Sequence, residues 1–291
     1  MFDLAALEAA LAGTVFAGKL HFSAITDSTN ADAIAGARSG EPHGSVYFAD
    51  EQRAGRGRGD HAWQSAAGDG LYVSVLLRLP IPALRLPLLP LAAGLAAAEA
   101  IRAVAGLDVD LRWPNDLLIG ERKAGGILVE SKIENGAAAF AVVGIGINVH
   151  QSGFAPDLTT PATSLDLESG VPSDSSSSLG WKAGRRVSRQ DLLVSLLESL
   201  EREALGLADA AAGVTVPARV AQASTWICGR RVEVHGPQAC TGITAGLDEN
   251  GFLLVRTAEG LVTVQTGGIR AASGGANVAA AGTEKAFGAE N

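Results

Sequence analysis

The sequence predicts an α+β fold that is followed by a small all-β domain. Helix signals alternate with short strand patterns over the first three quarters of the chain, whereas beyond about residue 224 only strand patterns remain. The 291 residues, 47% hydrophobic and 19% charged, are enough for roughly two globular domains. We expect one domain over residues 1–223 and a second over 224–271, followed by a disordered tail at 272–291.

The first domain begins with a predicted helix. Thr29 and Asp32 have the spacing of a capping box, which predicts a helix from near Thr29 to about residue 40. Apolar alternation and an alanine- and leucine-rich segment predict the elements that follow. These are strands at 45–50 and 71–79, a buried helix at 91–104, and strands at 109–113, 126–133 and 139–147.

One more helix precedes the all-β domain. Ser188 and Asp191 have cap spacing, and a leucine stripe then predicts an amphipathic helix to about Leu205, with Glu198 paired to Arg202. The serine-rich residues 171–188 are expected to form a flexible insertion. Strands predicted at 230–235, 239–247, 251–256 and 261–266 would form a small barrel or sandwich.

Composition and patterning exclude three classes of protein. Asp3 and Glu8 precede any basic residue, which is the wrong polarity for a secretory signal. The longest apolar stretch, 79–98, contains Arg85 and several prolines, and falls short of the roughly 18 to 20 unbroken apolar residues of a spanning helix. Two cysteines without companions at ligand spacing support neither a disulfide framework nor a zinc site. We expect a cytoplasmic protein that does not bind membranes.

The charge distribution indicates a local anion site. The formal net charge is -8, which argues against a surface that binds many phosphates of a nucleic acid. Yet three arginines lie close together in the segment QRAGRGRG (residues 52–59). Glycines there would let backbone N–H groups surround an oxyanion while the guanidinium groups bind it. The alternative is a solvated, glycine-rich surface loop.

Three other motifs could contribute polar groups. In RWPND (112–116), Asp116 could bind magnesium together with phosphates or orient an attacking amine. In RKAGG (122–126), a lysine lies beside backbone that a ligand can approach closely, and DSTN (27–30) offers hydroxyl and amide groups. The alternatives are an Asx turn and ordinary helix capping. P-loop, dinucleotide-binding and nucleophile-elbow patterns are absent from the sequence.

Four segments in fixed order resemble the catalytic domain of bacterial biotin-protein ligases. They are TDSTN (26–30), EQRAGRGRG with a tryptophan four residues later (51–63), RWPNDLLIGERKAGGILVE (112–130) and VVGIGINV (142–149). The match spans about residues 20–150, and the β-rich end resembles the SH3-like C-terminal domain of that family. The resemblance implies a mixed-sheet catalytic domain of the biotin/lipoate ligase type, which is class II synthetase-like.

The resemblance also implies roles for individual residues. The implied biotin-binding residues are Ser28, Thr29, Asn30, Gln52, Gly55, Arg56, Gly57, Arg58, Lys123, Gly125 and Gly126. The implied ATP-binding residues are Arg58, Trp63, Arg112, Asn115, Lys123 and Asn148. Arg58, Lys123 and Asp116 are the expected catalytic residues, and Asp116 is the expected magnesium ligand.

The family's reaction has two steps. Biotin and MgATP would give biotinyl-5'-AMP and pyrophosphate, and a lysine of a biotin carboxyl carrier domain would then take the biotinyl group. Because the first step brings two anions together, Arg56, Arg58, Lys123 and magnesium would offset the charge that grows in the transition state. A loop that closes over the adenylate would exclude water.

The chain departs from the family pattern at three positions. Asp60 and His61 stand where glycine and a basic residue are frequent, which affects the nucleotide contacts expected at that turn. Arg112 replaces a lysine of some members, an exchange that suits a phosphate contact. The 25 residues that precede TDSTN are fewer than a helix-turn-helix domain needs, so we expect no DNA binding.

Two other functions stay open at this point. A lipoate-type acyl-protein ligase would share the fold and the adenylate chemistry, but lipoate has no ureido ring for Ser28, Thr29 and Gln52 to bind. A non-catalytic anion-binding protein that uses the barrel for partner contacts would show no ATP turnover. The sequence leaves a homodimer open as well.

Overall fold

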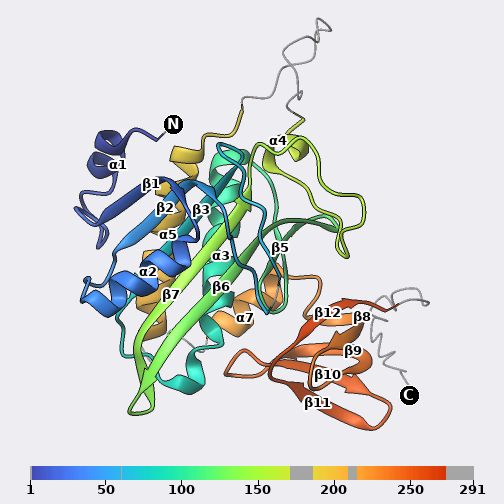
Figure 1. Ribbon diagram of the computed structural model, residues 1–291. Helices are drawn as coiled ribbons and strands as arrows, with labels where there is room; N and C mark the ends of the chain where they lie inside the picture. Colours follow the sequence, from blue (N-terminus) through green and yellow to red (C-terminus); the bar gives the residue numbers. More distant parts are fainter. Residues whose placement is uncertain (1, 60, 171–185, 209–214, 273–291) are drawn as a thin grey trace, which may run out of the picture.

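The computed structural model describes residues 2–59, 61–170, 186–208 and 215–272 (Figure 1). Most of the predicted insertion at 171–188 and nearly all of the predicted tail lie outside these residues. The described residues form a seven-stranded sheet with flanking helices and a separate five-stranded sheet near the C-terminal end.

The large sheet is the mixed sheet that the family resemblance implied. Its order is β1-β2-β3-β7-β6-β5-β4, with β1 parallel to β2 and the other neighbouring pairs antiparallel. The strands are β1 (Leu20–Thr26), β2 (Val46–Gln52), β3 (Gly70–Leu77), β4 (Asp110–Arg112), β5 (Asp116–Ile119), β6 (Arg122–Glu134) and β7 (Ala137–Asn148). Strands β1 and β5 were not predicted.

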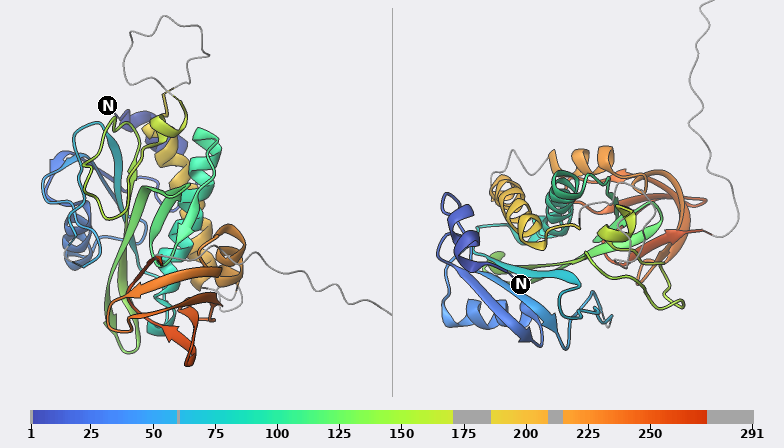
Figure 2. Two further views of the ribbon diagram at one scale, coloured as in Figure 1. Left: turned by 90° about the vertical axis from the view of Figure 1, so that its right-hand side faces the viewer. Right: turned by 90° about the horizontal axis from the view of Figure 1, so that it is seen from above.

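Helices cover both faces of this sheet. Helices α3 (Leu88–Ala105) and α5 (Arg189–Ala208) pack on one face over the main core, and α2 (Thr29–Ser39) packs on the other face (Figure 2). The remaining helices of the described segments are α1 (Leu4–Ala10), the 3-10 helix η1 (Ala83–Arg85), α4 (Leu165–Glu168) and α7 (Thr215–Ala223).

Helix α3 begins three residues before the predicted segment, because Pro90 fits in its first turn, where no N–H is needed. Among the described residues it is the one helix long and apolar enough to cross a membrane, with a mean hydropathy of 1.6. Within the fold, 61% of it is buried. A core helix passes the same test, so the length and hydropathy of α3 are weak evidence of a membrane span.

Helix α2 begins at Thr29 as predicted, but the predicted capping box is wrong. Ser28 is the N-cap residue, and its side chain makes no cap hydrogen bond. Asp32 instead accepts a hydrogen bond from the Thr26 hydroxyl at 2.7 Å. The Thr29 side chain is buried against β2 and β3. Its hydroxyl forms hydrogen bonds there with Gln52 and Ser74.

Helix α5 is capped as predicted, with the Asp191 N–H donating to the Ser188 hydroxyl at 3.1 Å. Its leucine stripe is buried, and consists of Leu192, Leu193, Leu196, Leu197 and Leu200. Arg202 contacts Glu198 as predicted, but its Nη1 donates to the Glu198 backbone carbonyl at 3.2 Å rather than to the carboxylate. Arg202 forms an ion pair with Glu99 at 2.7 Å, because the neighbouring helix α3 offers that carboxylate.

Strand β7 has two different faces, because its Gly-Ile-Gly-Ile-Asn sequence alternates with the period of a strand. Both isoleucines point into the main core. Gly144 and Gly146 lie on the α2 face, where an added Cβ would stand 2.0 Å from the Asn30 Oδ1 and 2.6 Å from the Trp63 Nε1, respectively. The bare backbone therefore lets α2 and the loop that follows β2 approach the sheet closely.

The C-terminal domain is the predicted small β domain, with a fifth strand that was not predicted. Its antiparallel order is β11-β10-β9-β8-β12. The strands are β8 (Cys228–His235), β9 (Cys240–Leu247), β10 (Leu253–Thr257), β11 (Gly260–Val264) and β12 (Gly268–Ala271). Contacts to the first domain include the Trp113 Nε1–H, which donates to the Gly251 carbonyl at 3.0 Å, and an Arg230–Glu121 ion pair at 2.8 Å.

We predict that Gly144→Ala destabilises the fold. The new methyl group would lie 2.0 Å from the Asn30 amide oxygen, so α2 or β7 must move. Overpacking of this kind costs about 1 to 3 kcal/mol. Urea unfolding followed by circular dichroism measures the loss in free energy of unfolding.

Gly153→Ala is the matched control, because nothing lies within 4 Å of its Cβ position. Its free energy of unfolding should change by less than about 1 kcal/mol. If Gly144→Ala is as stable as the control, then α2 does not lie this close to β7.

Candidate active site

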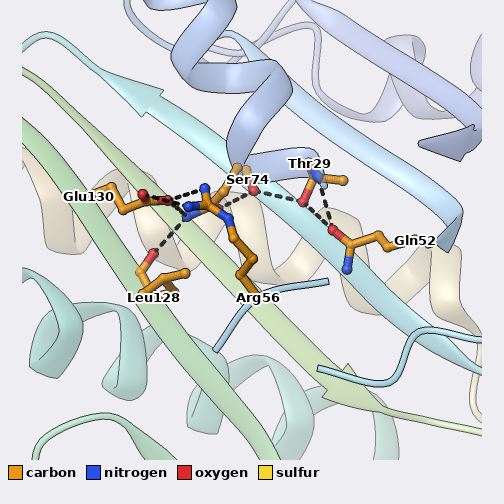
Figure 3. Close-up of polar contacts among 7 residues, drawn as sticks. Thr29, Gln52, Arg56, Ser74, Leu128 and Glu130 are labelled. Carbon is orange, nitrogen blue, oxygen red and sulfur yellow. Dashed lines mark hydrogen bonds and ion pairs between the residues drawn. The ribbon is translucent and has the colours of Figure 1, made fainter. Parts of the chain in front are cut away.

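Thr29 is the centre of a buried polar cluster on the α2 face of the sheet (Figure 3). The Thr29 N–H and hydroxyl contact the Gln52 Oε1 at 2.9 and 3.1 Å, and the hydroxyl lies 2.8 Å from that of Ser74. The Gln52 amide donates to the Ser65 hydroxyl at 2.8 Å. Ser28, also buried, lies beside this cluster in sequence. Such groups can present both donors and acceptors to a polar head group.

Asn30 extends the cluster toward β6. Its Nδ2 donates to the Leu128 carbonyl at 3.3 Å and to Glu130 at 2.9 Å, and Ser74 donates to its Oδ1 at 2.6 Å. Glu130 also accepts two hydrogen bonds from Arg56 of the glycine-rich loop, at 2.6 and 3.1 Å. The loop is therefore tied to the polar cluster through one carboxylate.

Gly55 and Gly57 allow the two sides of the glycine-rich loop to pair closely with each other. The Trp63 N–H donates to the Gly55 carbonyl at 2.8 Å, and the Gly57 N–H donates to the His61 carbonyl at 2.7 Å. A Cβ at Gly55 would lie 2.5 Å from the Trp63 carbonyl oxygen, and one at Gly57 would lie 3.1 Å from that of His61. Side chains at these positions would force the two sides of the loop apart.

Arg58 reaches from this loop to the C-terminal domain. Its guanidinium donates to the Gly267 carbonyl and, at 2.8 Å, to the Thr266 hydroxyl. Burial lowers the pKa of Arg58, and the negative charge of Asp116 acts in the opposite direction. An arginine keeps its charge at neutral pH despite such a shift, so a cation lies at the contact between the two domains.

A second charged cluster consists of Asp116, Lys123 and Arg112. The Lys123 Nζ lies 2.5 Å from the Asp116 Oδ1, and the Arg112 Nη2 lies 2.6 Å from the Oδ2. Burial alone would raise the pKa of the Asp116 carboxyl, but Lys123 and Arg112 together hold it below its usual value. Asp116 is therefore an anion at neutral pH, which makes it a strong partner for cations and a weak proton acceptor.

Trp63 lies beside this second cluster. The Lys123 Nζ is 5.5 Å from the centre of the Trp63 ring, and Gly126 and Gly146 leave room for the ring on the sheet. The Trp63 Nε1–H is buried without a hydrogen-bond partner in the structure. A flat heterocycle could stack on such a ring.

The remaining predicted residues contact backbone. The Asn115 Nδ2 donates to the Ile127 carbonyl at 2.7 Å, and the Asn148 Nδ2 donates to that of Thr163 at 3.0 Å. At Gly125, a Cβ would lie 2.9 Å from the Gly146 carbonyl oxygen, so this glycine permits the close pairing of β6 with β7. These contacts hold the strand ends in place, and a role of the asparagines in nucleotide binding stays a prediction.

The donor set suits magnesium that arrives with a nucleotide. Within the described part of the chain, no three His, Cys, Asp or Glu side chains gather into a metal site. Magnesium in proteins commonly uses one or two carboxylates together with substrate phosphates. The anionic Asp116 carboxylate fits that pattern, as part of a site that the phosphates would complete.

Several residues of the site were missed by the sequence analysis. Ser65, Ser74 and Glu130 take part in its hydrogen bonds, and Gly144 and Gly146 form its floor. The period-two alternation of glycine and isoleucine in β7 was an available signal for the floor. No local pattern marks Ser74 or Glu130, since their partners Asn30 and Arg56 lie 44 and 74 residues away.

Comparisons with known proteins agree with the resemblance seen in the sequence. Residues 22–148 match the Biotin/lipoate A/B protein ligase family, and residues 227–269 match the Biotin protein ligase C terminal domain. A bifunctional ligase/repressor BirA of Bacillus spizizenii is 40% identical over 157 residues, which cover 53% of this chain and 48% of that protein. The chain thus spans about half the length of the Bacillus relatives that it matches.

Other similarities extend over most of the chain. A biotin protein ligase structure from Aquifex aeolicus, in complex with biotin and ATP, superimposes with a TM-score of 0.69 and 27% identity over 87% of this chain and 98% of that chain. A biotin–[acetyl-CoA-carboxylase] ligase of Mycobacterium tuberculosis is 34% identical over 266 residues, which cover 86% of this chain and 88% of that protein. The chain therefore belongs to the biotin protein ligase family.

Proposed function

We propose that this protein is an ATP-dependent biotin-protein ligase. It forms biotinyl-5'-AMP from biotin and MgATP, and then transfers the biotinyl group to a lysine of a biotin carboxyl carrier domain. One observation carries the proposal: a single face of the sheet brings together the Thr29–Gln52 polar cluster, Arg56, and the Asp116–Lys123 pair. The names of the Mycobacterium and Aquifex proteins support the same substrates.

In the first step, the biotin carboxylate attacks the α-phosphorus of ATP and pyrophosphate leaves. The buried hydroxyl and amide groups of Thr29 and Gln52 would bind the ureido ring. Arg56 would bind the biotin carboxylate, Lys123 would offset the negative charge that grows where the two anions meet, and Trp63 would stack on the adenine. Magnesium bound to the phosphates would supply further charge neutralisation.

In the second step, the amine of the acceptor lysine attacks the carbonyl carbon of the adenylate and AMP leaves. The amine must lose a proton in this step. Asp116 has a lowered pKa because Lys123 and Arg112 surround it, so it is better suited to orient the amine than to remove its proton. Closure of the 53–59 loop would protect the mixed anhydride from water until the acceptor arrives.

The partner that we propose is the biotin carboxyl carrier domain of a carboxylase, which the name of the Mycobacterium relative supports. We place the enzyme in the cytoplasm, since both cysteines are free thiols, as is usual in a reducing compartment. A lipoate-type ligase is the second candidate, because the matching family includes lipoate ligases. The ureido-binding groups at Thr29 and Gln52 favour biotin over lipoate.

The proposal is tested by pyrophosphate release from ATP with biotin or with lipoate as the acid. We expect pyrophosphate release with biotin but not with lipoate. Mass spectrometry should then show biotinylation of an added carrier domain. Release with lipoate but not with biotin would make the lipoate ligase the correct function. No release with either acid would support a binding protein without catalysis.

We predict that Lys123→Ala slows adenylate formation about a hundredfold or more, because it removes a cation from the place where negative charge grows. Single-turnover formation of biotinyl-5'-AMP measures the effect. Lys132→Ala is the control, since Lys132 is an exposed residue that pairs with Glu134. A near-normal rate for Lys123→Ala would remove this lysine from the mechanism.

We predict that Arg58→Ala speeds dissociation of the adenylate by about tenfold or more, because a charged contact of the closing loop is lost. Stopped-flow dissociation of biotinyl-5'-AMP measures this rate. Thr266→Val separates the two roles of Arg58, since it removes only the hydroxyl contact on the C-terminal domain. Equal dissociation rates in wild type and Arg58→Ala would contradict loop closure by this residue.

A further inference from the structure

We propose that Glu130 is a positioning residue of this site, which places Arg56 and Asn30 for biotin binding. The inference rests on the proposed function and adds to it a residue that lies outside the predicted biotin, ATP, catalytic and metal sets. Glu130 lies on β6, opposite Val142 of β7, and joins the glycine-rich loop to the start of α2 (Figure 3).

Arg56 and Glu130 form a bidentate ion pair. The Glu130 Oε1 accepts from the Arg56 Nη1 at 3.1 Å, and the Oε2 accepts from the Nη2 at 2.6 Å. Two parallel, charge-assisted hydrogen bonds fix both the position and the orientation of a guanidinium group. Arg56 is 44% exposed and lies on a loop, so without this carboxylate its long side chain would sample many rotamers.

The contact with Asn30 sets the direction of the hydrogen bonds in the buried cluster. The Glu130 Oε2 and the Leu128 carbonyl both accept from the Asn30 Nδ2, at 2.9 and 3.3 Å, so the Asn30 Oδ1 must face Ser74. Ser74 has one hydrogen and donates it to that oxygen at 2.6 Å. Its own oxygen can then only accept from the Thr29 hydroxyl, 2.8 Å away, whose single hydrogen is shared between Ser74 and the Gln52 Oε1 at 3.1 Å. The Thr29 N–H also donates to that Gln52 oxygen.

Glu130 thus acts at both ends of the proposed biotin site. It holds the cation of the loop, and together with the Leu128 carbonyl it holds the Asn30 amide in the orientation that Ser74 donates to. Groups placed before the ligand arrives lose less conformational entropy on binding, so the effect should appear in affinity for biotin rather than in the chemical step.

The test is Glu130→Gln. This substitution keeps the shape of the side chain, but it removes the charge and replaces one of the two acceptor oxygens with a donor NH2 group. We expect the KM for biotin in pyrophosphate release to rise about tenfold, as for the loss of a charge-assisted contact, with kcat changed less than about twofold. The melting temperature should stay within a few degrees of wild type. Glu134→Gln on the same strand is the matched control, since Glu134 is exposed and pairs with Lys132.

A double-mutant cycle distinguishes positioning from a general structural effect. Because Glu130 also holds Asn30, adding Glu130→Gln to Arg56→Ala should raise the KM further, but clearly less than the tenfold that Glu130→Gln causes in the wild-type background. Fully additive losses, or a wild-type KM for Glu130→Gln, would overturn the inference. A lower KM would also overturn it, because Glu130 would then compete with the ligand for Arg56.

Two further measurements keep the outcome interpretable. If Glu130→Gln does not fold, Glu130→Asp keeps the charge but shortens the side chain, and it should raise the KM in the same direction. Calorimetric titration with biotin alone separates this inference from the proposed function. If biotin binds but no pyrophosphate is released, the ligase activity is refuted, and the role of Glu130 is then tested by the Kd for biotin. If the wild-type protein does not bind biotin, both proposals are refuted.

Discussion

The site depends on two successive positions of one strand face, Gly144 and Gly146 of β7, that carry no side chain. Asn30 lies over Gly144 and Trp63 lies over Gly146, at distances where a Cβ at either glycine could not fit. Residues two apart on one strand are about 7 Å apart. Strand β7 therefore sets the spacing between the polar cluster at the start of α2 and the aromatic ring beside Lys123. Ile145 and Ile147, which alternate with these glycines, anchor the same strand in the close-packed core beneath the site.

Electrostatics imposes the second constraint. Cations that are meant to meet an anionic ligand repel one another unless something neutralises them. Carboxylates of the protein neutralise cations of the site in the structure. Glu130 pairs with Arg56, and Asp116 pairs with both Lys123 and Arg112. These carboxylates differ in one respect, because Asp116 lies between two cations whereas Glu130 shares its charge with a neutral amide.

Features that depend on neighbouring residues were predicted from the sequence, and features that depend on strand order were not. The start of α2, the cap of α5 and most strands follow from local patterns. Arg202 contacts Glu198 only through the backbone carbonyl, because a carboxylate on α3 lies within reach and forms the ion pair with the same arginine. Glu130 could not be predicted, because its contact with Arg56 exists only once β6 and the loop after β2 are brought together across the sheet. Strand β1 was missed because its burial shows no clear alternation.

The C-terminal domain is coupled to the site at two points. Its Gly251 carbonyl accepts from Trp113, next to the Asp116 cluster, and its Gly267 carbonyl accepts from Arg58 of the loop. Gly267 has a φ of +133°, and a Cβ there would collide with the His235 carbonyl oxygen, so only glycine keeps this turn and its carbonyl in place. Because both contacts come from turns of one antiparallel sheet, a movement of the domain displaces both together. The position of Arg58 is therefore linked to that of the Asp116 cluster through the second domain as well as through the large sheet.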